Sequence, residues 1–180
     1  ECAKDGGKGL AFVFDEVQSP TRNRLMGKVK AKFPQARVFR YEAFGHANAT
    51  AATEAVFGKG VVQVPHFSPC SVILSLDNDF LDLDRPKASS VSKFMSGRRA
   101  EKPGDPMNRL YVLESRYTVT GGMADHRLRV HASQTMKVAV ALAKEIATAT
   151  GDAGLTAAAN AVKLTGDYKP RADYDVWIRE

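Results

Sequence analysis

The sequence predicts an α/β fold, a three-layer α/β/α sandwich with a mainly parallel sheet. One observation is that short apolar, strand-like segments alternate with segments of helical periodicity along the chain. Such alternation implies parallel strands joined by helical crossovers, with helices on both faces of the sheet. The other is that residues 71–77 and 109–114 are apolar almost throughout, as strands covered on both faces are. We therefore expect both to be central strands, with Leu74 in the core.

The first part of the chain supplies two strands and two helices. Residues 10–15 form a short apolar run that ends in an acid, and residues 36–44 form a second strand-like run. Between them Ser19 can cap a helix that Pro20 begins and Pro34 ends. The other elements predicted here are a helix over residues 48–57, closed by Gly58, and a weak strand over residues 61–67 that contains a proline.

The second part continues the alternation. Residues 71–79 carry the strongest strand pattern of the chain. The segments after it are predicted, in chain order, as a helix at 88–98, strands at 107–115 and 126–130, and a helix that Ser133 caps and that runs through residue 149 to Gly151. We expect residues 1–150 to form one α/β domain. Residues 151–180 are expected to be an extension in which Tyr168, Tyr174 and Trp177 fold back onto the domain or lead to a neighbour.

Composition excludes several classes of protein. The net charge is +6, but the basic residues are spread through every segment, so a solvated surface is favoured over a nucleic-acid site. The apolar runs are shorter than the roughly 20 residues of a transmembrane helix. The start of the chain has neither Met nor an apolar leader, from which we expect an internal cut or a processed end. Cys2 and Cys70 can hold neither an iron–sulfur cluster nor zinc by themselves, and a disulfide between them stays open.

Ligands of open parallel sheets bind outside the carboxyl ends of the strands. The loops to consider are therefore residues 15–19, 77–79 and 114–120. None of them carries the glycine-rich motif of a dinucleotide site or of a phosphate-binding loop. Arg116 suits a phosphate or an ion pair equally well. For each histidine we favour a surface or hydrogen-bonded structural role.

An acidic patch follows the strongest strand. Its carboxylates are Asp77, Asp79, Asp82 and Asp84. Two carboxylates two residues apart after a buried strand can share a magnesium ion, and the pattern is close to that of haloacid-dehalogenase-type phosphotransferases. That family, however, places the motif on its first strand and has Thr or Val where Leu81 stands here. The commoner interpretation is that these acids end a strand and cap the next turn.

Three stretches resemble one family. They are "SPTRNRLMGKVKAKFPQARVFRYEAF", "SVILSLDNDFLD" and "MNRLYVLESRYTVTGGMADHRLRV". In matching order over residues 10–149, they look like the molybdopterin-oxidoreductase-like region, related to the dimethyl-sulfoxide-reductase family, of the large iron–sulfur subunit of alternative complex III. The resemblance implies a Rossmann-like domain from a quinol-oxidising respiratory membrane complex, with iron–sulfur clusters elsewhere in the parent chain.

The resemblance also implies which residues occupy the cofactor loops. Where active relatives have a Gly-Ala-Asn-Pro type turn, this chain has Leu76-Asp77-Asn78-Asp79, which places negative charge at the pyrophosphate position. Where they have Asp-Pro-Arg leading through Thr to Ala-Asp, this chain has Glu114-Ser115-Arg116 and keeps Thr118, Thr120 and Asp125. We expect these nine positions to be the remains of a cofactor site: Asp77, Asn78, Asp79, Glu114, Ser115, Arg116, Thr118, Thr120 and Asp125.

The function expected from the resemblance is a non-catalytic scaffold, with no catalytic residue, no metal and no molybdenum cofactor of its own. Its partners would be other subunits of a membrane-bound respiratory complex and the iron–sulfur domain of the same parent chain, without nucleic acid or direct membrane insertion. We expect it on the periplasmic side of a bacterial inner membrane. One alternative is an active domain that binds a molybdopterin dinucleotide. Another is a magnesium-dependent phosphotransferase that uses Asp77 and Asp79.

Overall fold

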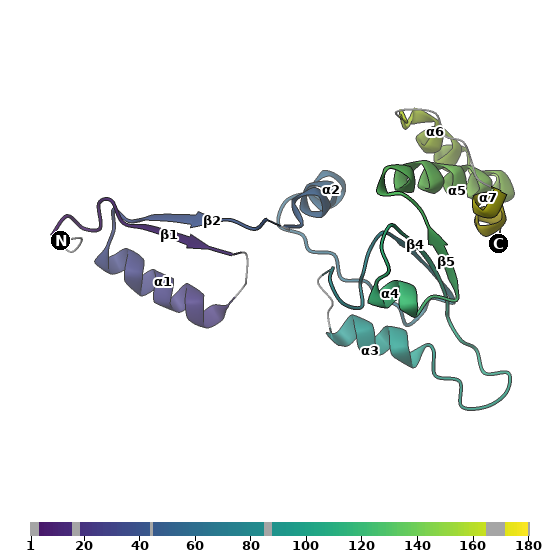
Figure 1. Ribbon diagram of the computed structural model, residues 1–180, viewed down its shortest axis with the longest axis horizontal. Helices are drawn as coiled ribbons and strands as arrows, with labels where there is room; N and C mark the ends of the chain where they lie inside the picture. Colours follow the sequence, from purple (N-terminus) through teal and green to yellow (C-terminus); the bar gives the residue numbers. More distant parts are fainter. Residues whose placement is uncertain (1–3, 16–18, 44, 85–87, 165–171, 180) are drawn as a thin grey trace. The chain divides into compact units, whose positions relative to one another are not determined.

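The computed structural model describes residues 4–15, 19–43, 45–84, 88–164 and 172–179. The chain divides into two compact units, Glu1–Gln63 and Val64–Glu180, and each is treated by itself below. The predicted α/β class is confirmed, because helices flank two parallel sheets (Figure 1). Cys2 and Tyr168 lie outside the described residues.

The first unit is built around a two-stranded parallel sheet. Its elements are β1 (Ala11–Phe14), α1 (Pro20–Lys32), β2 (Arg37–Arg40) and α2 (Ala47–Phe57). The register pairs Val13 with Phe39. Helix α1 begins as predicted, since Ser19 accepts a hydrogen bond from the Arg22 amide at 3.2 Å and Pro20 takes the first helical position. Gly58, with φ of 87°, follows α2 as its cap.

The second unit has a three-stranded parallel sheet in the order β3-β4-β5. Its elements are β3 (Val72–Leu76), α3 (Ala88–Ser96), β4 (Arg109–Glu114), α4 (Val119–Gly122), β5 (His126–Arg129), the 3-10 turn η1 (Ala132–Gln134), α5 (Thr135–Thr150), α6 (Ala153–Ala161) and α7 (Ala172–Arg179). The parallel ladders agree with the strand–helix alternation of the sequence. Of the six strands predicted for the chain, five are confirmed to within a few residues, and so is the 88–98 helix.

Strand β4 separates the two cores of this unit. Leu110 and Val112 point to one face, where they pack with Phe94 of α3. Tyr111 and Leu113 point to the other face, where they meet α5 and α7 (Figure 1). That second cluster consists of Tyr111, Leu113, Leu128, Val130, Val138, Tyr174, Trp177 and Ile178. The alternation of β4 thus produces helix layers on both sides of the sheet.

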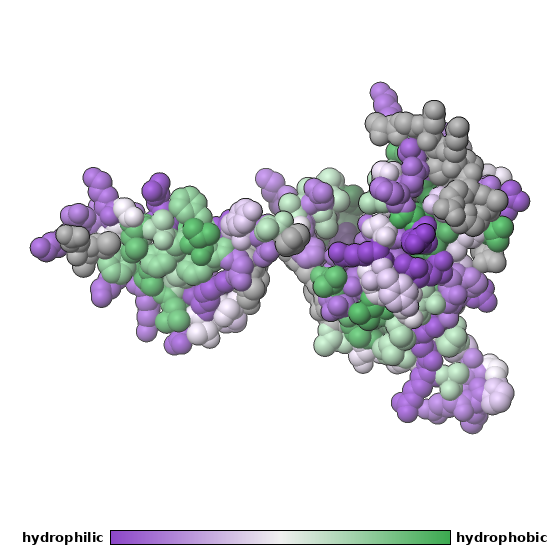
Figure 2. Space-filling model, viewed as in Figure 1, coloured by the Kyte–Doolittle hydropathy of each residue, from purple (hydrophilic) through white to green (hydrophobic). Residues whose placement is uncertain are grey.

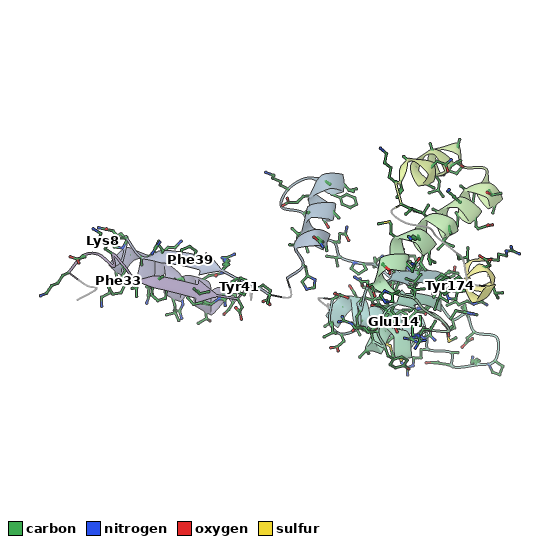
Figure 3. The ribbon with its side chains drawn as sticks, turned by 45° about the horizontal axis from the view of Figure 1, so that its top comes forward. Lys8, Phe33, Phe39, Tyr41, Glu114 and Tyr174 are labelled. Atoms are coloured by element: carbon green, nitrogen blue, oxygen red, sulfur yellow. The ribbon has the colours of Figure 1, made fainter. Side chains whose placement is uncertain are left out.

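Three aromatic rings form the centre of the α3 core. Phe80 stands 4.6 Å from Phe67 and 5.3 Å from Phe94 between ring centroids, with an edge-on geometry toward Phe94. Edge-to-face pairs of this kind add to the apolar area that the rings bury. On the other face, the Tyr111 ring meets Trp177 edge-on at 5.9 Å. Figure 3 shows the labelled Tyr174 of α7 beside the side chains of this core.

The prediction that Leu74 is a core residue is wrong. Its side chain is 42% exposed, whereas the neighbouring Ile73 is 8% exposed and packs in the α3 core. Among the described residues β3 pairs only with β4, so it is an edge strand and residues 71–77 are not central. The physical reason is that α5 and α7 cover β4 and β5, which leaves the face of β3 that carries Leu74 uncovered within its unit.

Other elements differ in detail. The weak strand expected at residues 61–67 is irregular, as its proline suggested. The helix expected from Ser133 starts at Thr135, because Ser133 itself lies in η1, and this helix exposes Met136. A short helix, α4, stands where the sequence indicated a loop. Within the part of the chain that the structure covers, none of the helices combines the length and apolar character needed to cross a lipid bilayer.

Candidate functional site

The loops that follow β3 and β4 meet at the carboxyl end of the sheet, as parallel strands require. They enclose a cavity of about 210 Å³. Its lining residues are Asp77, Asp79, Asp84, Ser115, Arg116 and Thr118. Five of these six are positions of the predicted cofactor loops. The structure therefore brings these five predicted positions together around one cavity. The chemistry available there depends on the hydrogen bonds that its polar atoms make.

Asp77 joins the two loops. Its Oδ1 accepts hydrogen bonds from the Ser115 amide at 3.2 Å and from the Ser115 hydroxyl at 3.4 Å. Its φ of 52° lies in the left-handed region, which non-glycine residues seldom adopt and Asp tolerates better than most. Next to it Asn78 contributes through its backbone, whose carbonyl accepts from the Ser75 hydroxyl at 2.6 Å. The turn after β3 is thereby held by polar contacts.

Asp79 is one of two buried carboxylates at the site, at 2% exposed. Its Oδ1 accepts from the Thr120 amide at 3.0 Å and from the Thr120 hydroxyl at 2.7 Å, and its Oδ2 accepts from the Leu83 amide at 3.3 Å. Burial by itself raises the pKa of Asp79, but the hydrogen bonds from Thr120 and Leu83, together with the nearby charge of Arg116, outweigh it and lower that pKa. The carboxylate is thus stably ionised inside the protein.

Glu114 is a second buried carboxylate, also 2% exposed, at the end of β4 (Figure 3). It accepts from the Thr118 hydroxyl and from Arg127 Nε, each at 2.5 Å. The guanidinium of Arg127 in turn lies over the Tyr117 ring, 4.7 Å from its centroid. A buried carboxylate is tolerated only with such partners, and this one holds the loop after β4 against β5.

Each of the two threonine hydroxyls near the cavity donates one hydrogen bond and accepts another. Thr118 Oγ1 donates to Glu114 and accepts from the Gly121 amide at 3.0 Å. Thr120 Oγ1 donates to Asp79 and accepts from the Leu81 amide at 3.1 Å. The hydroxyls at these two positions of the expected cofactor loop are therefore engaged within the chain.

Asp125 lies away from both loops around the cavity, whereas Asn78, Glu114 and Thr120 belong to the segments around it without lining it. Asp125 precedes β5, at the opposite end of the sheet, where its carboxylate receives both terminal nitrogens of Arg98 at 2.8 and 2.7 Å and the Leu110 amide at 2.7 Å. The hydrogen bonds from Arg98 and from Leu110 lower the pKa of Asp125 to about 2 against the opposing effect of burial, and the ion pair raises the pKa of Arg98. Asp125 has a structural role there.

Sequence reasoning missed Arg127 and Gly121. A β carbon at Gly121 would overlap the Glu114 carboxylate, so this position needs glycine for close approach. Arg127 could have been found, since a carboxylate that ends a buried strand requires a donor and the next strand alternates arginine with apolar residues. Asp84 was named only as part of the acidic patch, and its Oδ2 accepts from the Asp79 amide at 2.5 Å.

The acidic patch, the histidines and Cys70 supply the side chains that could bind a metal ion. Within the described ranges, no three His, Cys, Asp or Glu side chains are grouped so that they could hold a metal ion. The His126 ring stacks on Tyr111 at 4.4 Å, and His131 lies 3.4 Å from the Ser133 hydroxyl. Cys70 has its sulfur 3.6 Å from the His66 carbonyl oxygen.

Neither a protein-family model nor a curated protein matches this chain. The resemblance to molybdopterin oxidoreductases therefore stands on the quoted stretches, and its cofactor can be tested against the cavity. A pyrophosphate needs amides, hydroxyls or guanidinium groups directed at it. The cavity instead presents three carboxylates and one guanidinium, and the hydroxyl of Thr118, the threonine that lines it, donates to Glu114. The residues present do not fit the pyrophosphate of a molybdopterin dinucleotide.

Proposed function

We propose that this chain is the molybdopterin-oxidoreductase-like domain of an iron–sulfur subunit in a membrane-bound respiratory electron-transfer complex. In this proposal the domain is a non-catalytic scaffold without a molybdenum cofactor of its own. It docks against other subunits of the complex and against the iron–sulfur domain of its parent chain, on the periplasmic side of a bacterial inner membrane. The α/β fold, with its loops gathered at the carboxyl ends of β3 and β4, agrees with such an origin.

The observation that carries the scaffold part of the proposal is the way Thr118 and Thr120 are bonded. Both lie in the loop where the resemblance expects phosphate donors, yet each donates to a buried carboxylate of the chain itself. Like charges in contact repel, so Asp77 and Asp79 in the same cavity oppose an incoming pyrophosphate further. An active cofactor-binding domain is disfavoured for this reason.

The phosphotransferase alternative is not favoured by the geometry either. Both oxygens of Asp79 accept hydrogen bonds from Thr120 or Leu83, and the residue is buried. A nucleophile or magnesium ligand needs at least one oxygen directed at the substrate or the ion. If a magnesium-dependent phosphatase activity were found and Asp77→Asn abolished it, this alternative would replace the scaffold.

Exposed apolar side chains support a docking role. In the first unit they include Val13 at 66%, Phe39 at 48% and Tyr41 at 70% exposed. Val13 and Phe39 are partners in the β1–β2 register, so they adjoin on one face of that sheet. Figure 2 shows hydrophobic surface over the part of the chain that holds β1, α1 and β2. Clustered apolar surface of this kind commonly marks an interaction site.

Purification of the intact parent protein tests the proposal. From a membrane fraction it should co-purify with other redox subunits, and paramagnetic resonance of the reduced sample should detect iron–sulfur clusters. A control purification after a high-salt wash separates specific assembly from loose adsorption, because exposed charge contacts are screened by salt. A parent protein that is recovered alone and without clusters would rule the proposal out.

A further inference from the structure

The carboxylate of Asp79 is bonded as an anionic ligand would be. Two donors come from Thr120 in α4, and the third is the Leu83 amide in the segment after β3. The charge of Arg116 adds an attractive interaction from the rim of the same cavity. Amides, a hydroxyl and a guanidinium that converge on a buried oxyanion are the donor set that proteins use for phosphate groups.

We propose that Asp79 is the residue that closes this cavity to phosphate-bearing molecules, because its side chain fills the anion subsite from within. The proposal rests on the proposed function in treating the cavity as a degenerate cofactor cleft, and it assigns the loss of the cofactor to one side chain. An intramolecular carboxylate competes at high effective concentration with any dissolved anion. Removal of the carboxylate should therefore leave a subsite that accepts a small anion.

Asp77 provides the matched control. It lines the same cavity and carries the same charge, but its carboxylate accepts hydrogen bonds from Ser115 and not from Thr120 or Leu83. Asp77→Asn removes one negative charge, and asparagine tolerates the left-handed backbone of this position. It leaves the subsite filled by Asp79. Comparison of the two variants thus separates the effect of cavity charge on anion binding from the effect of filling the subsite.

The test is hydrogen–deuterium exchange on the intact parent protein, read in peptides that contain Leu83 and Thr120. In Asp79→Ala these amides lose their acceptor, so their exchange should rise roughly tenfold or more, since opening free energy sets the exchange rate. Millimolar pyrophosphate or acetate should restore protection in Asp79→Ala, because a ligand that binds the folded form stabilises it. The unchanged protein and Asp77→Asn should show no anion dependence.

Three results would overturn the proposal: no anion-dependent protection in Asp79→Ala, equal protection in Asp77→Asn, or equal protection in the unchanged protein. If Asp79→Ala unfolds the segment, the anion should refold it. Asp79→Ser provides a second variant, whose neutral side chain is smaller than that of Asp and also leaves space for a small anion. None of these outcomes depends on whether the parent protein assembles with respiratory subunits. Failure here and failure of the proposed function are thus distinguishable.

Discussion

Gly121 and Gly122 are adjacent in α4 and have different surroundings. A β carbon at Gly121 would overlap the Glu114 carboxylate, whereas one at Gly122 would lie 3.4 Å from the Tyr117 hydroxyl. Gly121→Ala should therefore lower the free energy of unfolding by about 1–3 kcal/mol, as overpacking does. Gly122→Ala should be neutral or slightly stabilising, since alanine favours helix.

Urea denaturation of the two variants measures this difference. Gly122→Ala is the control, because it makes the same chemical change one residue away. Equal effects of the two substitutions would mean that Glu114 does not approach Gly121 as described.

Asp125 gives a prediction about pH. Its folded pKa of about 2 lies below the ordinary value of 3.8, so its ion pair with Arg98 stabilises the fold above about pH 4 and loses that contribution as pH falls toward 2. The shift corresponds to about 2 kcal/mol. Asp125→Asn should therefore lower the free energy of unfolding by about this amount at neutral pH, and the difference from the unchanged protein should shrink in acid.

Denaturation at several pH values below 5 checks the direction. A difference that stayed constant, or grew as pH fell, would contradict the depressed pKa. Because Asp125 lies away from the cavity, the substitution should leave the exchange of the Thr120 peptide unchanged.

At the residue scale, the sequence predicted most of the candidate site. Asp77, Asp79, Ser115, Arg116 and Thr118 line the cavity, because strand ends of a parallel sheet converge. What it could not predict was hydrogen bonding. The hydrogen bond from Thr120 to Asp79 joins residues that are 41 positions apart in sequence. The close approach of Gly121 to Glu114 depends on tertiary packing. Asp125 was misplaced because it directly precedes β5, and the amino end of a parallel strand lies at the edge of the sheet opposite the carboxyl ends.

Strand β3 shows what an apolar run can and cannot predict. The run predicted a strand, and the strand is there, but whether both faces are covered depends on where helices pack. Ile73→Ala should lower the free energy of unfolding by about 2–5 kcal/mol because Ile73 is buried in the α3 core. Leu74→Ala should cost below about 1 kcal/mol because its side chain is half exposed.

Chemical denaturation of the paired variants is the measurement. Each removes a similar number of carbon atoms from neighbouring positions, so each serves as the control of the other. A larger loss for Leu74→Ala would show that the covered face of β3 is the opposite one.

Helix ends were predicted better than short helices. Ser19, Pro20 and Gly58 act through local bonding and backbone preference, which a sequence carries directly. Helix α4 was not predicted, since its four residues include two glycines. Its first turn is held by the Thr118 cap and by the carboxylate of Asp79, which is distant in sequence. Tertiary contacts outweigh propensity in so short a segment.

At the scale of the whole molecule, strand–helix alternation predicted that the strands pair in parallel. It did not predict how the strands are divided between sheets. The described strands form one sheet of two and one of three, in separate compact units. Two-stranded sheets bury little by themselves, and the exposed Val13 and Phe39 agree with this. The boundary expected near residue 150 stays a prediction. Trp177 of α7, beyond that boundary, packs in the core with Tyr111.

The content of molybdenum and pterin in the intact parent protein tests the central claim most directly. The account predicts molybdenum well below one atom per chain and no pterin fluorescence after oxidation, because Asp77 and Asp79 oppose a pyrophosphate and the threonine donors are engaged by the chain's own carboxylates. The same preparation should contain iron, which controls for loss of cofactors during purification. One molybdenum and one bound pterin per chain would contradict the account.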